Sequence, residues 1–405
     1  MKKYLVFFFL LSASASAQEM TIDEAISAGL SNNPEIQAAA IQAEQSLELK
    51  RSAFDLGKFS ASLMYGQYNS VYKDNNFTFS QSLPFPSTLA RNARLGDARA
   101  EGDRRMLLSE KQSLVFQIKN ACEHLLYLGA VKNLLNGQDS IYSDFYRAAS
   151  VRQQAGEGTP LETTTAQVQW EELKNTIRQN EADARIEKSH LQALTKSHAP
   201  FSVSGLLTRK DAPTDTASSA NGMKQWQRQQ TVIAQQAKKL ERSRLLPDLH
   251  LGYFNQTLVG TYNIDGKTEG YNPPSKRLQG VQAGISFPLW ARPQLARVRA
   301  AALEEEKMQK RAESFETFLT ASIRQAQEEI EKNRATLDYY ENQALKNAAL
   351  LVKQARTYYR QGEIGYIEYL QALRNSYALR SNHLAALYQY NLSVIKMEFL
   401  LGKIN

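Results

Sequence analysis

Two short segments of this 405-residue chain carry a glutamate at the same distance from a glycine. They are GEGTPLE, which ends at Glu162, and GEIGYIE, which ends at Glu368. The glycines and the proline in these segments are typical of a reversal between two helices, so each glutamate is expected in the first turn of a new helix. There it interacts favourably with the helix macrodipole, by about 0.3–1 kcal/mol. A carboxylate can also attract cations, which is the chemistry these residues offer beyond that local role.

The other residues that could do chemistry form no catalytic or metal-binding pattern. The histidines have no ligand spacing and the seven methionines form no cluster, so we expect no metal site and no cofactor. GEGTPL resembles the start of a dinucleotide-binding loop, but it follows a helix and lacks the third glycine. Because H-E-x-x-H, G-x-S-x-G and Walker sequences do not occur either, the sequence predicts a protein that is not an enzyme. The five histidines are His124, His190, His198, His250 and His383.

Charge and cysteine content restrict the possible partners and compartment. The 49 basic and 41 acidic residues leave a formal net charge of +8, but no basic cluster is interleaved with aromatic residues, so nucleic acid is not an expected partner. Residues 1–17 have the features of a secretory signal peptide: Lys2 and Lys3, the apolar run YLVFFFLL and an A-x-A pattern that ends at Ala17. The single cysteine, Cys122, excludes a disulfide framework.

Two long proline-free stretches predict helices of unusual length. Ser87–Ala155 and Leu295–Gln361 are rich in good helix formers, and each would extend about 100 Å at 1.5 Å per residue. In the second stretch, apolar and small residues recur at a mean spacing close to 3.5, the coiled-coil period. Each long helix is followed by one of the two glycine-containing loops and by a shorter helix, over about 161–194 and 366–400. Each half of the chain is therefore expected to form an antiparallel helical hairpin.

The loops form the tips of these hairpins, at residues 156–160 and 362–365. Their glycines are expected to adopt positive φ, and the proline to begin the following helix. The tip residues are Gly156, Gly158, Thr159, Pro160, Gly362 and Gly365.

Before each long helix the sequence predicts a pair of strands, over residues 59–83 and 248–289. Apolar residues alternate with small polar ones, and the lengths fit the roughly 9–11 residues of a transmembrane strand. A soluble two-hairpin sheet packed on a helical core is the alternative. The order of elements indicates two pseudo-repeats, residues 18–196 and 223–405, joined by a polar connector at 197–222.

Four membrane strands are too few for a closed barrel, since even narrow barrels use about eight. An open sheet edge in lipid leaves backbone groups unpaired at several kcal/mol each, so several copies of the chain must combine their strands.

Three segments resemble the TolC-like outer-membrane efflux proteins: TIDEAISAGLSNNPEIQAAA (residues 21–40), SFPLWARPQ (286–294) and the tail that begins YYRQGEIGYIEYLQAL at residue 358. The last two look most like the branch that serves heavy-metal cation pumps of the resistance-nodulation-division class. The resemblance implies a mainly α fold with a small transmembrane β part: a homotrimer whose 12-stranded barrel stands over an α-helical tunnel. It places the protein in the cell outer membrane, in contact with lipid, with its helices in the periplasm.

The resemblance also implies roles for the residues singled out above. Glu162 and Glu368 would line the periplasmic aperture, and the tip residues would dock a periplasmic adaptor protein that connects to an inner-membrane efflux pump. The connector would form an equatorial segment. The implied function is the passive exit of substrate, heavy-metal cations in this branch; multidrug efflux or type I protein secretion by the same architecture remains open. A periplasmic adaptor, with one helical hairpin and no membrane strands, is the competing class.

Overall fold

The computed structural model describes residues 18–197, 201–215, 217–263 and 269–403. The predicted signal peptide, residues 1–17, and His198 lie outside these ranges. The described chain is mostly helical with a small proportion of strand, which confirms the predicted mainly α fold class. None of its described helices contains a stretch that is long and apolar enough to cross a bilayer.

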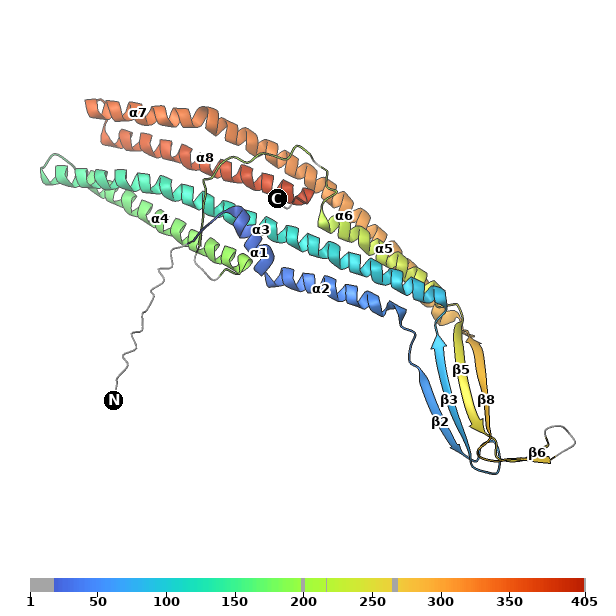
Figure 1. Ribbon diagram of the computed structural model, residues 1–405. Helices are drawn as coiled ribbons and strands as arrows, with labels where there is room; N and C mark the ends of the chain where they lie inside the picture. Colours follow the sequence, from blue (N-terminus) through green and yellow to red (C-terminus); the bar gives the residue numbers. More distant parts are fainter. Residues whose placement is uncertain (1–17, 198–200, 216, 264–268, 404–405) are drawn as a thin grey trace, which may run out of the picture. The chain divides into compact units, whose positions relative to one another are not determined.

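The helices account for most of the chain (Figure 1). α3 runs for 69 residues, and neither Gly129 nor Gly137 interrupts it. The second long helix was predicted as continuous, and this is wrong in one detail, because a five-residue π-helical segment, η2, separates α6 from α7. The bounds are α1 (Ile22–Asn32), α2 (Pro34–Arg51), the 3-10 turn η1 (Ser52–Phe54), α3 (Pro86–Gln154), α4 (Pro160–Thr195), α5 (Gly222–Ser243), α6 (Arg292–Tyr339), η2 (Tyr340–Ala344), α7 (Leu345–Gln361) and α8 (Tyr366–Leu401).

The chain forms two compact units, each assembled from separated segments. Among the described residues, unit 1 is drawn from 18–38, 108–197, 201–215, 217–222 and 317–403, and unit 2 from 39–107, 223–263 and 269–316. Helices α2, α3 and α6 therefore contribute residues to both units, and α5 belongs to unit 2 apart from its first residue, Gly222.

Unit 1 contains two antiparallel helical hairpins, α3 with α4 and α7 with α8 (Figure 1). Its core is apolar, and Ile118, Leu191 and Val394 are fully buried. The short α1 begins at a capping box, in which Thr21 Oγ1 accepts from the Glu24 backbone N–H and the Thr21 backbone N–H donates to the Glu24 carboxylate. Gly29 of α1 lies so close to Ile118 that an added Cβ would be 2.4 Å from its Cδ1.

The connector, which belongs to unit 1, contacts the helices of that unit at specific polar groups, which the sequence did not indicate. β1 (Gln18–Met20) and β4 (Phe201–Val203) form a small parallel pair. Asn391 of α8 donates to the Thr208 carbonyl at 2.7 Å, and its side-chain oxygen accepts from the Lys210 backbone N–H at 3.0 Å. The Lys210 ammonium lies 3.3 Å from the buried Glu123 carboxylate. A buried carboxylate needs such a partner, so these contacts fix the connector against α3 and α8.

Unit 2 contains a four-stranded antiparallel sheet in the order β2-β3-β5-β8 (Figure 1). The pairing of β3 with β5 joins the two predicted strand pairs into one sheet, with Phe79 opposite Tyr253. A two-stranded sheet that the sequence did not predict, β6 (Gly260–Asn263) with β7 (Glu269–Asn272), lies within the connection between β5 and β8. The four main strands are β2 (Ser60–Gly66), β3 (Asp74–Leu83), β5 (Asp248–Thr257) and β8 (Arg277–Ser286).

The helical part of unit 2 is held by close packing and by ion pairs. Gly102 of α3 approaches α5 so closely that an added Cβ would lie 2.8 Å from Ile233 Cδ1. The Lys238 ammonium of α5 pairs with Glu305 of α6, a carboxylate that is largely buried. Helices α3, α5 and α6 thus pack together within this unit.

Candidate functional site

The first hairpin tip is a tight turn between α3 and α4. Gly156 adopts a φ of +78°, and the Arg152 carbonyl accepts from the backbone N–H groups of Glu157 and Gly158, at 2.9 and 3.1 Å. Thr159 is the N-cap of α4, where its Oγ1 accepts from the Glu162 backbone N–H at 3.3 Å, and Pro160 follows at the start of the helix. Each group has the local function that its residue type predicts.

The second tip has the same kind of helix end. Gly362, at a φ of +77°, follows α7, and the Glu363 backbone N–H donates to the Tyr358 carbonyl at 2.9 Å. Gly365 is the N-cap of α8, and its backbone N–H donates to Glu368 Oε2 at 2.8 Å. A Cβ added at Gly156 or Gly362 would meet no atom within 4 Å, so only the positive φ requires glycine at these positions.

The prediction that all four tip glycines adopt positive φ is wrong for two of them. Gly365 has a φ of −76°, because an N-cap residue is extended and glycine is only one of several residues that fit. Gly158 is not among the residues with positive φ. An added Cβ there would lie 3.1 Å from the Gln153 backbone nitrogen, so Gly158 allows the backbone to fold back closely.

Glu162 and Glu368 both lie in the first turn of their helices, as the sequence predicts. Glu162 is half-buried and Glu368 is exposed. Burial, and to a smaller extent the charge of Glu162, raises the pKa of Tyr366 at the start of α8, so Glu162 lies near the tip of the other hairpin. Nowhere in the described ranges do three or more His, Cys, Asp or Glu side chains gather so that they could hold a metal ion.

An aromatic cluster that the sequence analysis did not identify joins the two hairpins just behind the tips. Phe145 of α3 makes edge-to-face contacts with Tyr366 and Tyr369 of α8, with ring centroids 5.0 and 5.4 Å apart. Burial raises the pKa of Tyr366 to about 12. The sequence feature that could have revealed this cluster is the concentration of tyrosine, phenylalanine and tryptophan close to both tips. The cluster consists of Leu135, Tyr142, Leu173 and Leu370, with Val131, Phe145, Trp170, Ile177 and Tyr366 packed against them.

The four-stranded sheet of unit 2 presents an apolar face and a polar face, which follow from its register. The apolar face is exposed: Val281, for example, is 86% exposed. The opposite face carries mostly serine, threonine, glycine and glutamine, with Met64, Phe254 and Leu278 as apolar exceptions. The apolar face consists of Ala61, Leu63, Tyr65, Phe77, Phe79, Gln81, Leu83, Leu249, Leu251, Tyr253, Val281, Ala283 and Ile285. Toward one end of the strands the same face becomes polar, with Asn75, Asn255, Thr257, Arg277 and Gln279.

Comparison with known proteins finds a match to one family model and to several solved structures. Residues 223–403 match the family model described as outer membrane efflux protein. No curated protein matches the sequence.

Solved structures match almost the whole chain. The CmeC outer membrane channel of Campylobacter jejuni is 15% identical, with a TM-score of 0.76 over 94% of this chain and 85% of CmeC. CusC is 14% identical, with a TM-score of 0.77 over 96% of this chain and 95% of CusC. The open state of the Neisseria gonorrhoeae outer membrane channel MtrE is 14% identical, with a TM-score of 0.76 over 96% of this chain and 93% of MtrE. These likenesses show that the chain has the fold of such channels.

Proposed function

We propose that this protein is the outer-membrane exit duct of a tripartite efflux system, and that it conducts substrate passively from an inner-membrane pump and a periplasmic adaptor to the outside. The observation that carries the proposal is the two-faced sheet of unit 2. A soluble protein rarely exposes a contiguous apolar patch of this kind, whereas lipid is the natural environment for such a face. The small and polar residues on the other face suit the lining of an aqueous channel.

The strand lengths and their flanking residues support the same function. β3, β5 and β8 have 10 residues each, which fits the roughly 9–11 residues of a tilted strand that crosses a bilayer. Phe287 and Trp290, just after β8, are 60% and 84% exposed. Exposed aromatic side chains at strand ends are typical of the girdles that lie at a membrane interface.

The open edges of the sheet support a homotrimer. In the described chain, β2 and β8 each pair on one side only. Unpaired backbone groups in lipid cost several kcal/mol each, so β2 of one copy is proposed to pair with β8 of the next. Three copies would give the 12-stranded barrel that the TolC-like resemblance implies, above a tunnel made by the helical hairpins.

The hairpin tips are proposed as the periplasmic end of the duct. Three copies would place Glu162 and Glu368 as six carboxylates around the aperture, where they attract cations. The tip residues, from Gly156 to Pro160 and from Gly362 to Gly365, are proposed to dock the adaptor.

Heavy-metal cations are the proposed substrate class, on the resemblance of the tail and of SFPLWARPQ to the metal branch. Multidrug efflux and type I protein secretion by the same architecture are the alternatives. Since a duct conducts its cargo without tight binding, selectivity is expected to come from the pump and from the charge of the aperture.

Two experiments test this function. Cell fractionation should place the protein in the outer membrane as a trimer that resists dissociation by detergent. A stable water-soluble monomer would contradict the proposal. Deletion of the gene should raise cellular copper, zinc, cobalt or silver, measured by mass spectrometry, and lower resistance to the same ion. Drug sensitivity without a metal phenotype would instead support multidrug efflux.

A further inference from the structure

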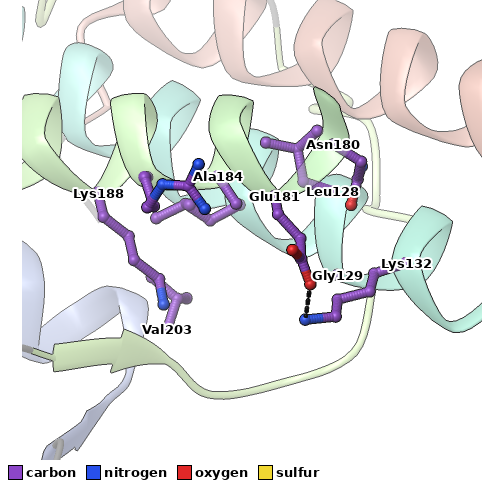
Figure 2. A pocket seen from close by; sticks show the side chains of 10 residues that line it. Leu128, Gly129, Lys132, Asn180, Glu181, Ala184, Lys188 and Val203 are labelled. Carbon is purple, nitrogen blue, oxygen red and sulfur yellow. Dashed lines mark ion pairs between the residues drawn. The ribbon is translucent and has the colours of Figure 1, made fainter. Parts of the chain in front are cut away.

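Unit 1 contains a hollow of about 470 Å³ between α3, α4 and β4 (Figure 2). The face of α3 that lines it carries Leu125, Leu128, Gly129 and Lys132, at intervals of three and four residues. This spacing places side chains on one side of a helix, so the hollow follows the helix axis. Val203 of β4 lies on its other side.

Small residues create the space. An added Cβ on Gly129 would meet nothing within 4 Å, although this glycine lies in the interior of a long helix that needs no turn there. Ala184 of α4 also lines the hollow. A glycine in a helix interior is destabilising by about 0.5–1 kcal/mol relative to alanine, so at this position it contributes room rather than helix stability.

The charged groups that line the hollow leave an excess of positive charge. Glu181 forms an ion pair with Lys132, with 2.9 Å between Oε1 and Nζ (Figure 2). The hydrogen bond from Lys132 and its charge hold the pKa of Glu181 below its ordinary value. Arg185 and Lys188, both exposed, line the same hollow, and neither forms an ion pair or side-chain hydrogen bond in the described part of the chain, although the charge of Arg185 also contributes to lowering the pKa of Glu181. One carboxylate thus faces three cations.

An amide at the wall of the hollow can bind a polar molecule. Asn180 lines the hollow and is only 7% exposed, and its side chain forms no hydrogen bond within the described ranges. Its amide atoms are not among the buried atoms left without a partner, so they are accessible from the hollow and can donate to and accept from a molecule there. Asn180 and Lys188 are separated by about 12 Å along the helix, at 1.5 Å per residue.

We propose that this hollow binds a diffusible, elongated organic acid. One carboxylate lies between Arg185 and Lys188, because a guanidinium presents a planar pair of donors that matches a carboxylate. A second acceptor group of the ligand receives the hydrogen bond of the Asn180 amide. The chain of the ligand contacts Leu125, Leu128 and Val203. The site is separate from the aperture and from the sheet, and it does not depend on the proposed transport activity.

The test is direct binding to the full mature protein purified in detergent, measured by isothermal titration calorimetry. The probes are azelate, a linear nine-carbon dicarboxylate, and succinate, its four-carbon analogue. Azelate should bind, and more tightly than succinate, because only the longer acid reaches from a carboxylate position between Arg185 and Lys188 to Asn180. Absence of azelate binding, or equal affinity for both acids, would overturn the proposal.

Variants identify the site. Arg185→Gln with Lys188→Gln should weaken azelate binding at least tenfold, since the charge-assisted hydrogen bonds are lost. Gly129→Leu should weaken binding by occupying part of the hollow, whereas Gly129→Ala should retain it. Arg178→Gln, on an exposed arginine of α4 outside the hollow, is the matched control and should bind within twofold of the parent. Circular dichroism shows that each variant is folded. Equal weakening in the control, or unchanged affinity in the double variant, would refute the assignment.

Discussion

Glu368 accepts a hydrogen bond from the backbone N–H of Gly365, with 2.8 Å between Oε2 and N. At the equivalent place in the first hairpin, Thr159 Oγ1 accepts from the Glu162 backbone N–H at 3.3 Å. The Glu368 carboxylate therefore stabilises a helix N-terminus directly, whereas in the first tip the threonine does so. The proposed role of the Glu368 charge at the aperture can consequently be separated by substitution from the role of its side chain as a helix cap, because glutamine at this position retains the cap.

The first prediction concerns the charge of the aperture. Glu162→Gln combined with Glu368→Gln removes the charge but keeps the size and the cap, so block by divalent cations should weaken with little change in thermal stability. Replacing both residues by alanine should in addition raise single-channel conductance, because the side chains become smaller. Conductance and block are measured in planar bilayers. Glu172→Gln, on an exposed residue of α4, is the control, and unchanged block in both double variants would contradict a role at the aperture.

The second prediction contrasts Gly362, where the backbone conformation requires glycine, with Gly137, where it does not. Gly362→Ala should destabilise the second tip by about 1 kcal/mol, since Gly362 has a φ of +77° that alanine disfavours. Gly137→Ala should instead stabilise α3 by about 0.5–1 kcal/mol, because Gly137 lies inside the helix and an added Cβ would come no closer than 4.0 Å to the Tyr377 hydroxyl. Hydrogen exchange of nearby amides measures both changes. Gly362→Asn should be milder than alanine, since asparagine tolerates a left-handed backbone.

The third prediction is a dependence of stability on pH at the aromatic cluster. Burial raises the pKa of Tyr366 to about 12, above its ordinary value of 10.0, and its hydroxyl has no hydrogen-bond partner among the described residues. A raised pKa means that the folded state favours the neutral phenol. Its contribution to stability is complete below pH 10 and is lost as the pH rises through 12.

Tyr366→Phe cannot ionise, so it should be more stable than the parent at pH 11, by about 1 kcal/mol for a side chain that remains partly exposed. At pH 7 it should be equal or slightly more stable, because it removes an unsatisfied hydroxyl. Thermal unfolding at the two pH values measures the difference. Tyr358→Phe, on an exposed tyrosine, is the control, and an identical pH response in both variants would show that Tyr366 is not responsible.

The sequence predicted the elements whose signals are local. No proline follows Pro86 within the helix Pro86–Gln154, and this indicates a long helix. In NFTFSQSL, apolar residues alternate with polar ones, and this indicates a strand. The register between β3 and β5 was not predicted, because it pairs residues 166 to 180 positions apart. The parallel pair of β1 with β4 likewise depends on segments of three residues that carry no pattern.

At the candidate site, the positions of Glu162 and Glu368 in the first helical turn follow from the glycine and proline signals. The role of Gly158 could not be predicted from the sequence, because the close approach of Gly158 to the Gln153 backbone nitrogen depends on how the turn closes. The π-helical segment Tyr340–Ala344 contains neither glycine nor proline, so nothing local marks it. Asn180 reads as an ordinary polar helix residue, and only the packing of α3, α4 and β4 shows that it is buried beside a hollow.

The last prediction tests whether neighbouring copies join through the sheet edges. Ser62 of β2 and Gln282 of β8 both lie on the polar face, one at each edge of the sheet. With both replaced by cysteine, a bismaleimide that spans about two strand spacings, roughly 10 Å, should join copies into dimers and closed trimers on a denaturing gel. The native Cys122 does not interfere, because it is fully buried and burial raises the pKa of its thiol to about 12. Each single cysteine gives dimers at most, since one reactive residue per copy cannot extend a chain of cross-links. A double variant that reacts with the reagent and yet yields only monomers would show that β2 and β8 do not meet, and the homotrimeric barrel would have to be abandoned.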